Sequence, residues 1–490
     1  MAIRFTKSIT DLQADAEHGH GLKRTLGAPG LVALGIGAII GAGLFSLTGI
    51  AAANNAGPAV TLSFVLAAVG CAFAGLCYAE FASMIPVAGS AYTYSYATMG
   101  ETIAWIVGWD LVLEYAVGAA TVGISWSSYL VSLLHNFGVS LPVQFVASPW
   151  QPVTMPDGTQ LYGIINLPAA LIVMSLSILL MRGTKESATF NNVMVVLKIT
   201  IVLVFIALGF GYINSANYTP YIPQNTGVFG EFGWSGILRG AGVVFFAFIG
   251  FDAVSTAAQE AKNPQKDMPI GIIGSLVVCT ILYVLFSHVL TGIVNYQDFK
   301  NVAAPVALAI DRTGITWLMP TIKLAILAGY SSVILVMLLG QSRVFFTMSK
   351  DGLLPKFFSD VHTNFHTPWK SNLFFGVVVS LFAAFAPISL VGEVTSMGTL
   401  LAFILVCAGI IVLRKQQPNL PRAFKTPLVP LVPILGIISC GAMMLSLMTD
   451  YMHIFRLVGW LAIGLVIYYT YSIKHSKVRA AAEGRPVEDR

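Results

Sequence analysis

Residues 35–45 read Gly-Ile-Gly-Ala-Ile-Ile-Gly-Ala-Gly-Leu-Phe, and they lie within an apolar run that extends from about residue 31 to residue 55. A helix of roughly 20 apolar residues is long enough to cross the hydrocarbon core of a bilayer. Each glycine costs a helix about 1 kcal/mol relative to alanine, so the segment Gly41-Ala42-Gly43 weakens this helix near its centre. Backbone groups that a break frees inside a membrane must find partners within the protein. The stretch therefore indicates either close packing between helices or a helix that is broken at a binding site.

The composition of the whole chain is that of a membrane protein. Of its 490 residues, 56% are hydrophobic and only 10% are charged, whereas a soluble domain carries about 25% charged residues. A soluble fold with so few polar groups could not cover its apolar surface, but a lipid environment removes this conflict. We therefore predict an all-α integral membrane protein with about twelve transmembrane helices. The apolar runs that support this prediction cover residues 31–55, 59–84, 101–134, 163–181, 187–213, 235–258, 270–294, 318–348, 371–387, 390–413, 427–448 and 455–473.

Lysine and arginine residues gather in alternate loops and at both ends of the chain. Of 27 such residues, 21 fall in the two tails and in the segments 182–186, 260–269, 343–370 and 414–425. The remaining loops contain only Lys300, Arg312 and Arg456. Because basic residues are retained on the cytoplasmic side of a membrane, this distribution predicts cytoplasmic termini and an even number of helices. The net charge of +5 therefore reflects orientation in a membrane, and we expect no binding of nucleic acid.

A second glycine-rich helix is expected at residues 235–258, which contain Gly240, Gly242 and Gly250, followed by Asp252. For a single pattern of this kind, close packing between helices would be the simpler interpretation. The second helix, however, comes five predicted spans after the first, so that each heads a block of five. This recurrence favours an inverted repeat in which two broken helices form a binding site near the centre of the membrane.

The glycine-rich stretches belong to a longer set of motifs. They are residues 22–27 (LKRTLG), 35–45, 77–81 (CYAEF), 86–92 (PVAGSAY), 108–111 (GWDL) with Glu114 and Tyr115, 248–252 (FIGFD), 340–343 (GQSR) and 348–353 (MSKDGL). Through these motifs the chain resembles the amino acid–polyamine–organocation (APC) superfamily, and most closely its cationic amino acid transporter family. The resemblance implies the LeuT-like fold, with a five-plus-five inverted repeat and two peripheral helices. It divides the chain into a cytoplasmic N-terminal tail (1–30), two repeats (31–213 and 235–413), helices 11 and 12 (427–473) and a cytoplasmic C-terminal tail (474–490).

The resemblance also implies where an amino acid substrate would bind. The start of a half-helix presents free N–H groups and the positive end of a dipole to a carboxylate, and glycine lets the ligand approach the backbone closely. By resemblance, the carboxylate-binding residues are Gly41, Ala42 and Gly43. The other substrate-binding residues of the two breaks are Ile39, Ile40, Phe246, Ala247 and Ile249, with the carbonyl groups of Ile39, Phe246 and Ile249 receiving the ammonium group.

Tyr330, in the predicted span 318–348, is expected to fill the distal part of this site. A filled distal pocket favours small neutral L-amino acids such as alanine. Cationic substrates stay an alternative, because their side chains would need a deep acidic partner, for which Glu114 is the candidate.

Lys198 lies about halfway along the predicted span 187–213. A lysine at that depth costs roughly 2.5–3.5 kcal/mol on insertion scales, and ionisable residues inside a membrane usually have a function. Proton-coupled members of the family carry a lysine here, where sodium-coupled relatives bind an ion. The resemblance therefore implies that Lys198 couples transport to protons, and a permanently neutral structural lysine is the alternative.

Three acidic residues are also expected inside the membrane. Asp110 and Glu114 are four residues apart and so share one face of a helix, and Asp252 follows the second glycine-rich segment. Each is a candidate for gating, and structural hydrogen bonding within the bundle is an equally good interpretation.

We expect a secondary active transporter that imports L-amino acids across the plasma membrane by proton symport and alternating access. An amino acid exchanger and an amino acid sensor with little transport are the alternatives. The sequence contains no phosphate-binding loop, set of metal ligands or nucleophile motif above chance, so we expect no enzyme, no metal and no cofactor. The expected partners are the amino acid, the proton and the lipid bilayer, and a small membrane subunit is also compatible with the sequence.

Overall fold

Long helices dominate the computed structural model, which describes residues 5–9, 12, 26–85, 89–150, 152–154, 160–182, 187–258, 261–365, 367–449 and 451–486. Within this part of the chain, eight helical segments are long and apolar enough to cross a membrane, and four shorter apolar helices accompany them. The only strands described, β1 (Pro152–Thr154) and β2 (Gln160–Tyr162), form a short antiparallel hairpin that the sequence did not predict. The prediction of an all-α membrane protein is confirmed.

The first five spans follow the predicted order. The first span consists of α2 (Ala28–Ile39), η1 (Gly43–Leu47), α3 (Thr48–Ala51) and η2 (Ala52–Ala56), and it turns at Gly57 (φ +61°) through η3 (Gly57–Ala59). The second span is α4 (Val60–Met84). The third is one continuous helix that consists of α6 (Glu101–Val112), η4 (Leu113–Val117) and α7 (Gly118–Asn136). The fourth and fifth spans are α8 (Leu167–Arg182) and α9 (Ser187–Gly209). The short helix α5 (Ser90–Thr98) lies between the second and third spans.

The next five spans repeat this order. The first of them consists of α10 (Gly233–Val244), η8 (Phe245–Phe248) and α11 (Ala253–Thr256). The other four are α12 (Pro264–Ile293), α14 (Leu318–Lys350), α15 (Trp369–Phe385) and α16 (Ile388–Gln416). The short helix α13 (Pro305–Thr313) again falls between the second and third spans. Because five is an odd number, a chain that crosses the membrane at each span would start its second block on the opposite side, as the predicted inverted repeat requires. The repeat boundaries 31–213 and 235–413 stay a prediction.

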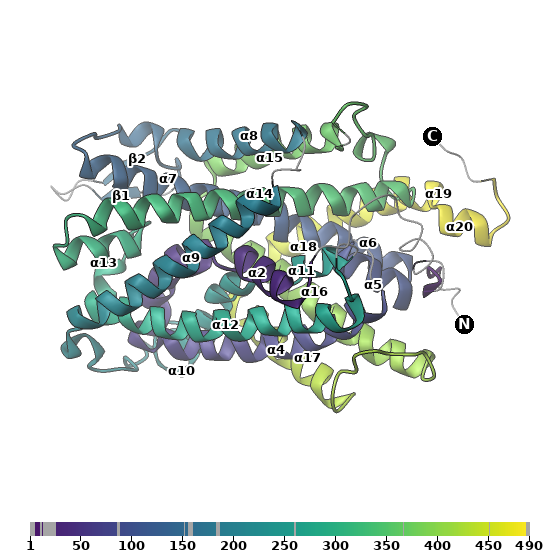
Figure 1. Cartoon of the computed structure of the whole chain (residues 1–490), viewed down its shortest axis with the longest axis horizontal. Helices are drawn as coiled ribbons and strands as arrows, with labels where there is room; N and C mark the ends of the chain where they lie inside the picture. Colours follow the sequence, from purple (N-terminus) through teal and green to yellow (C-terminus); the bar gives the residue numbers. More distant parts are fainter. Residues whose placement is uncertain are drawn as a thin grey trace.

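Two further spans complete the bundle. They are α17 (Leu431–Leu447) and α18 (Tyr451–Ile467), the second of which continues through η12 (Tyr468–Ser472) and α19 (Ile473–His475) to α20 (Lys477–Ala482). Short turns outside the spans are η5 (Val143–Phe145), η6 (Phe210–Tyr212), η7 (Ser215–Tyr218), η10 (Tyr296–Phe299) and η11 (Lys356–Phe358). In Figure 1 the long helices lie lengthwise, with α8 beside α15 and α4 beside α12, two pairs that are also in extensive contact.

Residues near the two ends of the chain meet at one end of the bundle. Arg479 of α20 forms an ion pair with the buried carboxylate of Glu101, at 3.2 Å, and its guanidinium group lies 4.3 Å from the ring centre of Phe5. The part of the predicted C-terminal tail that the structure describes is therefore docked on the bundle. Most of the predicted N-terminal tail, including residues 22–25 of the first motif, lies outside the described residues, as do residues 86–88.

Candidate functional site

The first predicted break is present in α2. The helix ends at Ile39, because Ile40 has an extended backbone (φ −71°, ψ 106°), and the chain becomes helical again at Gly43 in η1. The amide groups of Leu44 and Phe45 donate to the carbonyl of Gly41, each at 3.2 Å. The first N–H groups of this second half-helix have no partner one turn earlier. They are therefore available to a ligand.

The second predicted break follows η8. Ile249 is extended in ψ (133°), and Gly250 has φ +116°, a conformation that residues with a side chain rarely adopt. A Cβ atom on Gly250 would lie 2.9 Å from the carbonyl carbon of Ala38. Gly250 thus allows the backbone of the second break to lie directly against the end of α2.

The two breaks touch each other in this structure. A Cβ atom on Gly43 would lie 2.2 Å from Cα of Ala247. The hydroxyl of Tyr283, from α12, lies 3.0 Å from the carbonyl oxygen of Ile39 and 2.8 Å from that of Ala247. Sequence reasoning missed Tyr283, and its only signal was that a buried tyrosine hydroxyl needs a partner.

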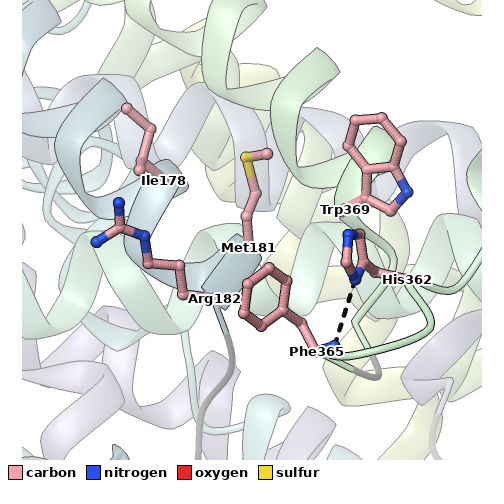
Figure 2. Close-up of a pocket in the computed structure, with 6 residues that line it drawn as sticks. All are labelled: Ile178, Met181, Arg182, His362, Phe365 and Trp369. Carbon is pink, nitrogen blue, oxygen red and sulfur yellow. Dashed lines mark hydrogen bonds between the residues drawn. The ribbon is translucent and has the colours of Figure 1, made fainter.

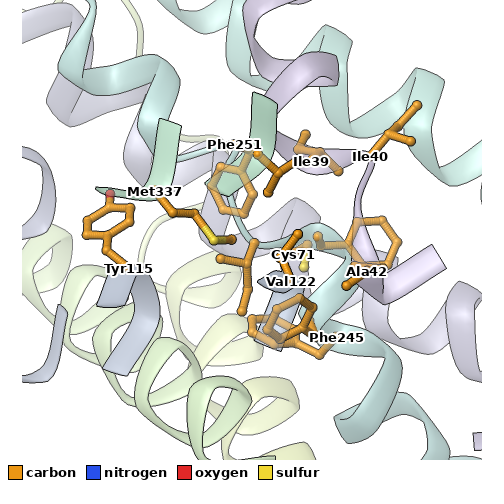
Figure 3. Packing of buried hydrophobic residues seen from close by; sticks show 14 of the residues in the cluster. Ile39, Ile40, Ala42, Cys71, Tyr115, Val122, Phe245, Phe251 and Met337 are labelled. Atoms are coloured by element: carbon orange, nitrogen blue, oxygen red, sulfur yellow. The ribbon is translucent and has the colours of Figure 1, made fainter. Parts of the chain in front are cut away.

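Aromatic side chains surround the breaks. The hydroxyl of Tyr330 lies 2.9 Å from that of Ser46, and the Tyr330 ring centre is 6.0 Å from Phe45 and 5.6 Å from Tyr129. Tyr330 therefore lies beside the second half of the broken first span, and Phe246 is buried in η8. Figure 3 shows side chains of this region in one buried cluster, in which the labelled residues include Ile39, Ile40, Ala42, Phe245 and Phe251.

Lys198 connects α9 to the first break. Its amine donates a hydrogen bond of 2.7 Å to the carbonyl of Gly37, and it is buried. A Cβ atom on Gly329 of α14 would lie 3.1 Å from Cε of Lys198, so the side chain also packs against α14. The neighbouring hydroxyls of Ser331 and Ser332 bond to carbonyl groups of their own helix, those of Leu327 and Gly329.

The three intramembrane acids gather beyond the second break. Asp252 accepts hydrogen bonds from the hydroxyls of Tyr115, at 2.5 Å, and Ser90, at 3.3 Å. Glu114 of η4 adjoins Asp252. Asp110, on the same span, faces α16, because its Oδ1 lies 3.2 Å from the position that a Cβ atom on Gly398 would occupy. The structure thus brings Glu114 to Asp252.

Two touching helix breaks, in a bundle of long apolar helices, are the arrangement expected of an APC-type transporter. The chain belongs to the amino acid permease family, whose model matches residues 26–469.

The chain is also similar to individual transporters. It is 48% identical over 472 residues to the branched-chain amino acid permease BcaP of Bacillus subtilis (strain 168), covering 96% of this chain and 98% of that protein. It is 42% identical over 476 residues to the methylthioribose transporter of the same organism, covering 97% and 99%. It is 39% identical over 401 residues to the vacuolar cationic amino acid transporter 4 of Arabidopsis thaliana, covering 82% and 65%. The chain is therefore a multi-pass membrane transporter and not an enzyme.

Proposed function

We propose that this permease imports neutral aliphatic L-amino acids, the branched-chain ones included, across the cell membrane in symport with protons. The observation that carries the proposal is the meeting of two helix breaks at Gly43 and Ala247, beside uncharged side chains. The similarity to a branched-chain amino acid permease over nearly the full length supports the aliphatic side chain.

The backbone of each break suits one end of an amino acid. Free N–H groups at Gly41, Ala42 and Gly43 would bind the carboxylate, and carbonyl groups at Phe246 and Ile249 would bind the ammonium group. The carbonyl of Ile39 would contribute too, since a carbonyl oxygen has two lone pairs and Tyr283 uses only one. A substrate must separate Gly43 from Ala247, because their backbones are in contact without it.

The surroundings of Tyr330 favour an uncharged substrate side chain. Ser46, Phe45 and Tyr129 lie around it, and the interaction of Glu114 with Asp252 supports a role for Glu114 other than binding a substrate side chain. None of these three described neighbours is acidic, and burying a cationic side chain without an acidic partner is costly.

A competition panel tests the substrate. Uptake of labelled leucine into proteoliposomes should be inhibited by isoleucine, valine and, more weakly, alanine, and not by arginine. Strong inhibition by arginine would contradict the aliphatic proposal. If methylthioribose inhibited uptake and the amino acids did not, the result would favour a second candidate function, methylthioribose transport, which the 42% identical relative suggests.

Lys198 is the proposed proton-coupling group. A charged amine would hold α9 to the carbonyl of Gly37, close to the break at Ile40. Burial favours the uncharged amine, and a carbonyl partner favours the charged one. Protonation from outside and release to the cytoplasm would therefore tighten and then loosen the contact between α9 and the broken helix.

Gradient-driven uptake tests this role. Wild-type proteoliposomes with an inward proton gradient should accumulate leucine when choline replaces sodium, and a protonophore should abolish the accumulation. Lys198→Met should lose accumulation while retaining exchange. Lys415→Met is the matched control, because Lys415 is an exposed lysine at the end of α16, outside the site. If Lys198→Met still accumulated leucine, another residue would have to couple transport to protons. Exchange without accumulation in the wild type would identify an exchanger, and binding without flux would identify a sensor.

A further inference from the structure

A pocket of about 310 Å³ lies at the end of α8 and the start of α15. Figure 2 shows its lining, in which the Arg182 side chain and the rings of His362 and Trp369 lie on either side of Met181 and Phe365. Ile178 completes the lining. The hydroxyl of Thr367 donates a 2.7 Å hydrogen bond to the carbonyl of Met181, which fastens the loop before α15 to the end of α8. The pocket is therefore built from the end of α8, the start of α15 and the loop that connects α14 to α15.

One part of the pocket suits hydrocarbon. Ile178 and Phe365 are 43% and 46% exposed, and Met181 and Trp369 are also apolar over most of their surface. Tryptophan is enriched where a transmembrane helix meets the lipid headgroups. A pocket with this lining suits the depth where an acyl chain joins a headgroup.

Two of the lining residues, Arg182 and His362, carry hydrogen-bond donors, and none of the six described lining residues is acidic. Nδ1 of His362 accepts from the amide groups of Asn364, at 3.2 Å, and Phe365, at 3.4 Å, so the neutral ring carries its hydrogen on Nε2. Among the residues that the structure describes, no carboxylate lies within ion-pair distance of Arg182. The nearby carboxylate of Asp360 is already paired with Lys370. Within the described part of the chain, Arg182 is thus a cation with no carboxylate partner, and His362 lines the same pocket as a second donor.

We propose that this pocket binds an anionic phospholipid of the inner leaflet. The phosphate would accept hydrogen bonds from Arg182 and His362, and an acyl chain would lie along Ile178 and Met181. Arginine matches the geometry of phosphate oxygens with two parallel donors. Basic pockets between transmembrane helices on the cytoplasmic side bind anionic headgroups in other proteins. The assignment to the inner leaflet uses the orientation predicted from the basic loops, and the binding itself does not depend on the transported substrate.

Lipid-dependent thermal stability of the purified full-length protein in detergent tests the proposal. Dioleoyl phosphatidylglycerol should raise the melting temperature more than dioleoyl phosphatidylcholine, whose headgroup has no net charge. Arg182→Gln should weaken the response to phosphatidylglycerol about fivefold in half-saturating concentration, the effect of one basic residue near a membrane surface. Arg182→Lys should retain most of it. Lys415→Gln is the matched control, since Lys415 is an exposed cation at the end of α16.

Three results with the variants and the two lipids would overturn the proposal, and a fourth would come from a soluble phosphate. They are an unchanged response in Arg182→Gln, an equal loss in Lys415→Gln, and an equal response to both lipids. Glycerol 3-phosphate without acyl chains should give no stabilisation. An effect of this soluble phosphate as large as that of the lipid would mean that the site binds a free anion and not a membrane lipid.

Discussion

Gly43 allows two broken helices to touch because it has no side chain. A Cβ atom there would lie 2.2 Å from Cα and 2.4 Å from the amide nitrogen of Ala247. Backbone atoms cannot move aside as the tip of a flexible side chain can. A Cβ atom on Gly250 would likewise lie too close to backbone atoms of Ala38. The positive φ of Gly250 also favours glycine at this position. Glycine is therefore required at both breaks by contact and at the second also by conformation.

Gly43→Ala should reduce both stability and transport. Overpacking of this kind typically costs about 1–3 kcal/mol, and the displaced backbone belongs to the proposed carboxylate site. The melting temperature of the purified protein and leucine uptake per folded molecule would be measured together. Gly441→Ala is the control, because no atom lies within 4 Å of its added Cβ, so it should leave uptake unchanged and should not lower the melting temperature. Normal uptake by Gly43→Ala would show that the backbone at this position does not bind substrate.

At the scale of elements, a buried ion-pair network joins α4 to the connection between α16 and α17. Glu80 accepts two hydrogen bonds from Arg414, both at 2.8 Å, one from Arg422 at 3.1 Å and one from the amide of Thr426 at 2.8 Å. Its carboxylate is fully buried. These contacts indicate a structural connection between helices.

Glu80→Gln should therefore destabilise the protein strongly. Removing one partner of a buried pair costs about 3–5 kcal/mol, because the remaining charges are left without compensation. Thermal unfolding in detergent would measure the loss. Glu483→Gln removes the same charge from an exposed pair with Arg485, and such pairs contribute about 0–1 kcal/mol. Equal melting temperatures for the two variants would contradict the structural role of Glu80.

At the scale of the whole molecule, described residues near both ends of the chain pack on one face of the bundle. Lys7 pairs with Asp351, which follows α14, and Asp351 also accepts a 2.6 Å hydrogen bond from Tyr92. On the same face, Arg479 of α20 binds Glu101. With an even number of spans and the basic residues concentrated on this side, we expect this face to be cytoplasmic.

Labelling of single cysteines would test this orientation in intact cells. All five native cysteines are buried, so an impermeant maleimide should give little background. Trp150→Cys, at a position that is 75% exposed, should react from outside. Glu483→Cys should react only after the cells are permeabilised. The reverse pattern would mean that the chain is inserted with its termini outside.

The sequence by itself determined the class of protein, the order of the spans and the positions of both breaks. These are local properties, because hydropathy marks a span and clustered glycines mark a weak helix wherever they occur. It did not predict the β1–β2 hairpin or the short helices α5 and α13, whose segments lack the apolar length of a span.

Only the tertiary structure decided which side chains meet. Tyr283 reaches both breaks, Glu114 adjoins Asp252, and Glu80 binds arginines more than 300 residues away. A soluble helix shows its buried face by an apolar stripe. A transmembrane helix is apolar towards lipid and towards protein alike, so its sequence does not show how it is rotated about its axis. Packing between helices fixes that rotation, and with it the partners of each buried polar group.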